Sequence, residues 1–129
     1  MKRNYLDFTI KNEVWNTYRL KDGITLSLKI VLINVLLEGE DKLGNPQLGF
    51  QMNNILGIRV PDDWTQLPKE DDIGFDIIHD DWNEYKTTNG YMLQFKPIIS
   101  QISRSGQNDP MGNPVYLVQS QPMVKIRKT

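Results

Sequence analysis

The sequence of this chain contains an internal repeat, and this feature constrains the fold more than any other. Trp15-Asn16-Thr17-Tyr18 returns as Trp82-Asn83-Glu84-Tyr85, so the two copies are offset by 82 − 15 = 67 positions. The offset becomes 112 − 44 = 68 where Gly44-Asn45-Pro46 matches Gly112-Asn113-Pro114. An internal repeat indicates that each copy is one structural unit and that the units pack together. The sequence therefore predicts a first β repeat at 1–60, an acidic linker at 61–72 and a second β repeat at 73–129, together one pseudo-symmetric domain.

Both copies carry the sequence pattern of a β-hairpin. In the first copy, residues 14–20 and 24–29 alternate in polarity on either side of Asp22-Gly23. In the second copy, Asn89-Gly90 stands at the matching place. These dipeptides favour a type I′ turn, because both of its central residues need a positive φ. We expect the same hairpin twice.

The rest of each copy is also predicted to be extended, since no segment shows sustained helical periodicity. The apolar run 30–37 is rich in β-branched residues, which favours a strand. Pro97 matches Ile30 in the second copy and predicts a bulge or a strand edge there. Residues 61–72 allow at most one helical turn before Pro68.

The predicted fold class is all-β and internally duplicated, with two pseudo-twofold-related β repeats of about four strands each forming a barrel-like or sandwich domain. One copy alone, at about 55 residues, would bury a marginal core, whereas two copies packed about an axis resemble a fused homodimer. Closing the barrel would also remove exposed strand edges. Two small barrels side by side are the alternative.

The composition excludes several classes of function and of binding site. The net charge of −1 gives no overall attraction to nucleic acid or to an anionic membrane. There is no cysteine, which excludes disulfides, thiol nucleophiles and cysteine-ligated zinc. The N-terminus lacks the apolar run of a signal peptide, and no apolar stretch approaches the roughly 20 residues of a membrane-spanning helix. We expect a soluble, cytoplasmic protein with no membrane contact and no cofactor.

The repeated Trp-Asn-x-Tyr motif supplies the first candidate binding residues. They are Trp15, Asn16 and Tyr18 in the first copy and Trp82, Asn83 and Tyr85 in the second. Tryptophan and tyrosine are enriched at interface hot spots, so the motif could form two symmetry-related contact surfaces. The alternative is structural: the aromatic rings pack the core and the barrel rim, while the asparagines hydrogen-bond a neighbouring loop.

Lys29 and Lys96 are the second pair of candidates, each inside an otherwise apolar strand. Two lysines near the pseudo-twofold axis could hold an anion. The alternative is a solvated outer face, where the aliphatic stem of each lysine lies over its neighbours.

The acidic stretch between residues 62 and 84 contains His79-Asp80-Asp81, which could contribute ligands to Ca²⁺ or Mg²⁺. The spacing is not that of an EF-hand loop, and the first copy has Asn12-Glu13-Val14 at this place. We therefore predict no metal site and interpret the stretch as a solvated acidic loop.

The chain has no glycine-rich phosphate loop and no Gly-x-Ser-x-Gly elbow, and His79 is its single histidine. We therefore predict no catalytic residue, and a non-enzymatic binding or assembly module built by tandem duplication, with a protein partner or self-association. The basic ends of the copies, at Arg59 and at residues 125–128, leave a single-stranded nucleic-acid (RNA) binding protein as the alternative. A small enzyme with a site near the pseudo-twofold axis is less favoured.

Overall fold

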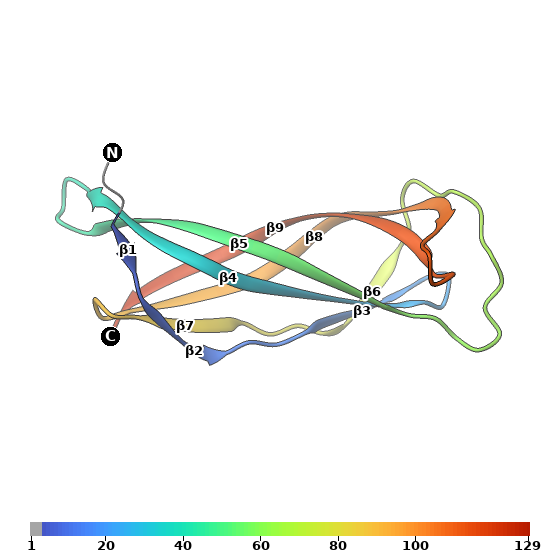
Figure 1. The fold of residues 1–129 in the computed structure, drawn as a ribbon, viewed down its shortest axis with the longest axis horizontal. Helices are drawn as coiled ribbons and strands as arrows, with labels where there is room; N and C mark the ends of the chain where they lie inside the picture. Colours follow the sequence, from blue (N-terminus) through green and yellow to red (C-terminus); the bar gives the residue numbers. More distant parts are fainter. Residues whose placement is uncertain (1–3) are drawn as a thin grey trace.

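The computed structural model describes residues 4–129, which form an elongated molecule (Figure 1). Its strands are β1 (Tyr5–Leu6), β2 (Phe8–Asn12), β3 (Asn16–Leu20), β4 (Thr25–Glu40), β5 (Pro46–Arg59), β6 (Phe75–His79), β7 (Asn83–Thr87), β8 (Tyr91–Asn108) and β9 (Pro114–Lys128). They form two antiparallel sheets, which confirms the all-β prediction. Over residues 4–129, no helix has the length and apolar character needed to span a membrane.

Each sheet combines strands from both halves of the chain. The first sheet has the order β1-β4-β3-β6, with β5 also paired to β4, and the second has the order β2-β7-β8-β9. Strand β6 comes from the second half but pairs with β3, placing Ile77 opposite Tyr18. Strand β2 comes from the first half but pairs with β7, placing Ile10 opposite Tyr85. The two halves thus exchange one strand each.

The sheets are open, and the predicted closure into a barrel is wrong. Within the described residues, β1, β5 and β6 are edges of the first sheet, and β2 and β9 are edges of the second. Strand length is the reason. Strands β3 and β7 have 5 residues each, whereas β4 has 16 and β8 has 18. Most of each long hairpin therefore lacks a third strand that could continue the sheet toward closure.

The long hairpins replace the short strands that the sequence predicts. The expected segments 24–29 and 30–37 are one strand, β4, because nothing at Ile30 interrupts its ladder with β5. The register shifts later, between Leu32 and Asn34. Pro97 causes no bulge and lies opposite Pro122, so two residues without an N–H share one position of the ladder.

Both hairpins predicted at Asp22-Gly23 and Asn89-Gly90 are confirmed, whereas the type I′ turn is wrong. Leu20 N donates to Ile24 O at 2.9 Å, and Gly23 N donates to Leu20 O at 3.0 Å, which closes a three-residue loop. Gly23 has a φ of 89°, but no other residue type between 4 and 129 has a positive φ. A three-residue loop needs the left-handed conformation only at its glycine, so Asp22 keeps an ordinary backbone.

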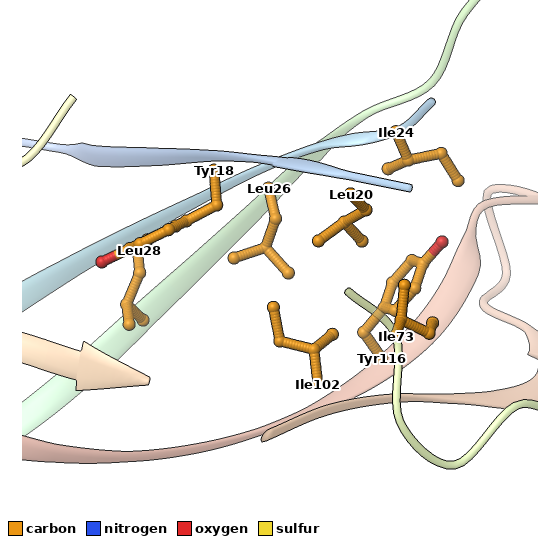
Figure 2. Close-up of a cluster of buried hydrophobic side chains, with 8 residues drawn as sticks. All are labelled: Tyr18, Leu20, Ile24, Leu26, Leu28, Ile73, Ile102 and Tyr116. Atoms are coloured by element: carbon orange, nitrogen blue, oxygen red, sulfur yellow. The ribbon is translucent and has the colours of Figure 1, made fainter. Parts of the chain in front are cut away.

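Two hydrophobic cores hold the sheets together, and each receives side chains from both sheets. The first core contains Tyr18, Leu20, Ile24, Leu26, Leu28, Ile73, Ile102 and Tyr116 (Figure 2). The second core contains Ile30, Leu32, Val35, Tyr85, Leu93 and Phe95. Because the tip of each long hairpin packs on the core at the base of the other, neither half completes a core alone.

The exchanged strands deliver one aromatic ring to each core. Phe75 of β6 meets Tyr18 edge to face, with 5.7 Å between ring centroids. Phe8 of β2 meets Tyr85 in the same way, also at 5.7 Å. Edge-to-face pairs of this kind contribute about 0.5–1.5 kcal/mol beyond the area that they bury.

Residues 61–72 lie against the first core. Trp64 packs on that core, and Glu70 forms an isolated β-bridge with Arg104. A hydrogen bond of 3.0 Å from Trp64 N to Pro61 O closes a single turn, in place of a helical turn.

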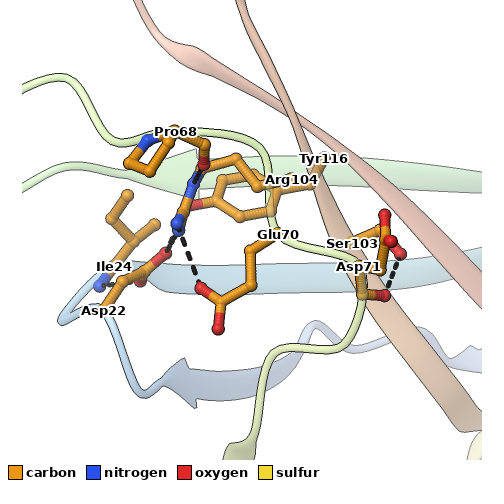
Figure 3. A network of polar contacts seen from close by, with 8 residues as sticks. All are labelled: Asp22, Ile24, Pro68, Glu70, Asp71, Ser103, Arg104 and Tyr116. Atoms are coloured by element: carbon orange, nitrogen blue, oxygen red, sulfur yellow. Dashed lines mark hydrogen bonds and ion pairs between the residues drawn. The ribbon is translucent and has the colours of Figure 1, made fainter.

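A buried arginine fastens this segment to the body of the molecule (Figure 3). Arg104 of β8 is 3% exposed, and its guanidinium lies 2.6 Å from Asp22 Oδ2 and 3.1 Å from Glu70 Oε2. Its Nε donates to Pro68 O at 2.7 Å. The Tyr116 hydroxyl donates to the same oxygen of Asp22, also at 2.7 Å. The network joins the β3–β4 turn, β8, β9 and residues 68–70.

Replacing Arg104 with alanine leaves Asp22 without its buried partner. We expect Arg104→Ala to lower the free energy of unfolding by about 3–5 kcal/mol. Lys69→Ala is the matched control, because Lys69 and Asp71 form an exposed ion pair at 3.9 Å, a type worth less than about 1 kcal/mol. Urea unfolding followed by circular dichroism measures both, and equal losses in the two variants would contradict this account of the network.

Candidate functional site

Apart from the step between β1 and β2 at Asp7, the chain passes between the two sheets at two crossings, and both repeated tryptophans lie there. Residues 13–15 connect β2 of the second sheet to β3 of the first, and residues 80–82 connect β6 of the first sheet to β7 of the second. Asn12 Nδ2 donates to Trp82 O at 3.0 Å, so the two crossings are in contact. The fold therefore brings the two copies of the Trp-Asn-x-Tyr motif together.

The asparagines of the motif lie in the interior and fix the crossings. Asn16 and Asn83 are each 1% exposed. Asn83 Oδ1 accepts a hydrogen bond from Val14 N at 2.8 Å, and Asn16 Oδ1 accepts one from Asp81 N at 2.7 Å. Each asparagine thus satisfies a backbone N–H in the crossing of the other half, which leaves it no free surface for a partner.

The tyrosines of the motif belong to the cores. Tyr18 is 2% exposed and Tyr85 is 0% exposed. Burial raises the pKa of Tyr18 to about 12, and the nearby Asp80 carboxylate adds to this rise. Burial raises the pKa of Tyr85 as well, and so does its hydrogen bond of 2.8 Å to Glu13 Oε2. Both hydroxyls therefore stay protonated at neutral pH.

The first tryptophan forms a cluster at the surface, which we call the first cluster: Glu13, Trp15 and Lys29. Lys29 Nζ lies 5.4 Å from the centroid of the Trp15 ring and 3.4 Å from Glu13 Oε1. Trp15 is 42% exposed. The lysine therefore combines a cation–π contact with an ion pair.

The second tryptophan forms the second cluster: Asp80, Trp82 and Lys96. Lys96 Nζ lies 5.2 Å from the centroid of the Trp82 ring and 2.9 Å from Asp80 Oδ2. Trp82 is half-buried. A second ammonium group, from Lys125 of β9, lies 4.8 Å from the same ring centroid.

The two lysines of the clusters already have anionic partners. Lys29 and Lys96 keep about a quarter of their side-chain surface exposed, and each faces a carboxylate of its own crossing. Their positive charges are therefore offset within the chain, so the geometry does not favour the anion site considered from the sequence. The clusters instead cover the crossings with an apolar ring and a neutral ion pair.

The clusters differ at one position of the neighbouring edge strand. Gly57 of β5 lies opposite Ser27, whereas Lys125 takes the matching place in β9, opposite Gln94. A Cβ added at Gly57 would meet only the Ser27 Cβ, at 4.0 Å. A hollow of about 410 Å³ therefore remains beside the first cluster, lined by Trp15, Thr17, Thr25, Ser27, Gly57, Ile58 and Arg59.

A further exposed apolar surface lies on the edge strands, which the candidate residues do not include. Every residue of β9 from 121 to 128 is exposed, as are residues 53–56 of β5. The apolar side chains among them are Met123 (40%), Val124 (38%), Ile126 (43%), Ile55 (45%) and Leu56 (38%). Edge strands carry a row of unpaired backbone N–H and C=O groups, so these segments can accept another strand.

Two further features noted in the sequence are the acidic stretch and the basic end of the second copy. Among the described residues, no three His, Asp or Glu side chains come together as a possible metal site. The basic residues at the end of β9 are Lys125, Arg127 and Lys128, and Lys125 contacts the Trp82 ring.

Sequence reasoning missed the carboxylates of the clusters and the open edges. Glu13 and Asp80 occupy matching positions of the two copies and are both acidic, so the repeat itself carried that signal. No comparable signal marks the edges, because they depend on which strands stay unpaired. The chain matches no known protein family model, no curated protein and no solved structure.

The raised pKa values of the buried tyrosines predict a loss of stability at high pH. Unfolded tyrosine ionises near pH 10, while Tyr18 in the folded chain holds its proton to about 12. The free energy of unfolding should be unaffected by these groups below about pH 10 and then fall by about 1.4 kcal/mol per pH unit for each such tyrosine.

Urea unfolding between neutral pH and pH 11 measures this fall. Tyr18→Phe, which keeps the ring and removes the hydroxyl, should make the fall less steep. A stability that stays level through this range would refute the prediction.

Proposed function

We propose that this chain is a non-enzymatic assembly module that binds another protein chain by adding its strand to an open sheet edge. The observation that carries the proposal is the terminal part of β9, where residues 121–128 are exposed and Met123, Val124 and Ile126 present apolar side chains. Native proteins usually blunt or cover such an edge, and an exposed long edge with apolar side chains invites pairing. In strand addition, backbone hydrogen bonds supply affinity and alternate side chains supply specificity.

We also propose that the module arose by tandem duplication. Four contacts recur at matching positions of the two halves: the Phe–Tyr edge-to-face pair, the Asn–backbone bond, the Lys–Trp contact and the Lys–carboxylate pair. The Gly-Asn-Pro hairpin tips recur as well. In each tip one aspartate side chain, Asp41 or Asp109, accepts hydrogen bonds of 2.8–2.9 Å from two backbone amides.

Within this proposal, the clusters have a supporting role. The cluster ion pairs hold the crossings, and Trp15 and Trp82 reach the outer face of the sheets. The hollow beside Trp15 borders β5 at Gly57, so it can receive a side chain from a strand that pairs with that edge.

Two double variants test the proposal with the same change in net charge. Leu56→Lys/Ile126→Lys places charge on both edges, and Leu43→Lys/Met111→Lys places it at the hairpin tips, where each side chain is 86% exposed. We expect the edge variant to lose self-association or a retained protein partner, and the tip variant to keep it. Light scattering after size exclusion and affinity capture compare them, with thermal unfolding as the control for folding.

The reverse pattern, with binding lost at the tips and kept at the edges, would place the partner elsewhere and overturn the proposal. An unmodified chain that stays monomeric and retains no macromolecule would overturn it as well.

A second candidate, binding of single-stranded RNA, has one observation in its favour. Lys125 lies against the Trp82 ring, and Arg127 and Lys128 follow it along β9. Phosphate contacts of this kind weaken steeply with salt, and an aromatic ring can stack a base. If this candidate is correct, the chain should retard labelled oligouridylate on a native gel at low salt. The double variant Lys125→Ala/Arg127→Ala should abolish this shift. No retardation at low salt would exclude it.

A further inference from the structure

Two of the open edges carry opposite charge. The terminal part of β9 holds Lys125, Arg127 and Lys128 with no acidic residue among residues 121–128. Strand β6 contains Asp76 and is flanked by Asp72 and Asp81, while the neighbouring Asp80 is already paired with Lys96. Strand β6 pairs with β3 on one side only, so its other side has no ladder partner within the described residues.

Both edges also expose apolar side chains. Ile77 and Ile78 of β6 are 58% and 53% exposed. Met123, Val124 and Ile126 of β9 are between 38% and 43% exposed. Figure 1 shows β9 running to the end of the molecule where the C-terminus lies, with β6 toward the other end. One molecule therefore presents a basic apolar edge and an acidic apolar edge at different places.

We propose that the partner is a second copy of this chain, whose β6 pairs with β9 in antiparallel register. The inference rests on the proposed function and specifies its partner. The register that places Asp76 opposite Lys125 also places Ile77 opposite Val124 and Ile78 opposite Met123. Phe75 then lies opposite Ile126. One register thus satisfies a charge pair and three apolar pairs, each of the kind that stabilises adjacent strands.

The faces of the two sheets agree with this register. Ile77 lies opposite the buried Tyr18, and Val124 lies opposite the buried Phe95, so both point to the core side of their sheets. Asp76 lies opposite the exposed Arg19, and Lys125 contacts Trp82 on the outer side. In this register, core-side residues of β6 lie opposite core-side residues of β9, and outer-side residues lie opposite outer-side residues. A continuous sheet requires this agreement of faces.

The pairing has a consequence for the assembly. In the antiparallel register centred on Ile126, two β9 strands would place Lys125 opposite Arg127, so like charges disfavour that pairing. Pairing between two different edges is heterologous, so each added molecule leaves one edge of each kind free. The product is a linear chain or a ring, and not a closed twofold dimer.

Cysteine cross-linking tests the register directly, because the chain has no cysteine of its own. A chain with Ile77→Cys is mixed with a larger, tagged chain that carries Val124→Cys, and Ile78→Cys is mixed in the same way with Met123→Cys. Opposite residues of paired strands have Cα atoms about 4.5–5.5 Å apart, within the range of a disulfide. We expect a mixed disulfide dimer on a non-reducing gel, and a ladder when Ile77→Cys and Val124→Cys are in one chain.

The matched control is Ile10→Cys on β2, which is 57% exposed and also on an edge, mixed with Val124→Cys. It should give little mixed dimer. Equal cross-linking by Ile10→Cys and Ile77→Cys would mean random collision and overturn the inference.

Charge exchange gives a second, independent readout by sedimentation of the full chain. Asp76→Lys and Lys125→Asp should each weaken association by roughly two- to fivefold, and the two together should restore it. Lys42→Asp, at a hairpin tip, controls for the change in net charge, and thermal unfolding controls for folding.

A chain that is monomeric at all concentrations, or that stops at a dimer, would overturn the inference. The proposed function would fail separately, if the edge and tip lysine variants retained the same partner proteins.

Discussion

The exchange of β2 and β6 between the two halves is the constraint on which the rest of the structure depends. Each core needs a ring from the other half, Phe75 against Tyr18 and Phe8 against Tyr85. The chain must therefore pass between the sheets at residues 13–15 and again at residues 80–82, and the backbone at each of these crossings leaves both ladders. Buried backbone groups without partners are costly, so each crossing requires a side chain that can replace a strand. Asparagine suits this place because it both accepts and donates: Asn83 accepts from Val14 and donates to Ile30 O at 2.6 Å.

The clusters follow from the same constraint. Glu13 and Asp80 lie on the crossings, where each is only partly solvated and needs a cation. Lys29 and Lys96 come from the long strands beneath, so each ion pair ties a crossing to the sheet that it enters. Trp15 and Trp82 then lie against the lysines. The Arg104 network has no counterpart in the other half, since Leu37 stands at the matching position. It serves residues 61–72, which occur once and need their own attachment.

The repeat and the two-residue alternation were enough to predict an all-β chain with hairpins at Asp22-Gly23 and Asn89-Gly90, because these signals are local. Closure was predicted wrongly because strand length depends on what interrupts a ladder, and neither Ile30 nor residues 53–54 interrupt it. The exchange of strands could not be read from the sequence, since pairing β2 with β7 or with β3 leaves the same local pattern. The eight candidate residues are all repeated residues, and four of them are buried. A residue is repeated when both cores require it, so repetition alone could not distinguish the buried Tyr18 from the exposed Trp15.

The open edges show how one set of side chains can both prevent and direct pairing. Natural edge strands are protected by lysine and proline, and β9 has both, in Lys125 and Pro122. Such residues discourage pairing with an identical or neutral edge. A lysine, however, excludes a partner only when the partner lacks a negative charge to meet it. The acidic edge of β6 supplies that charge beside exposed isoleucines. The residues that keep two β9 edges apart are therefore the ones that select an acidic strand.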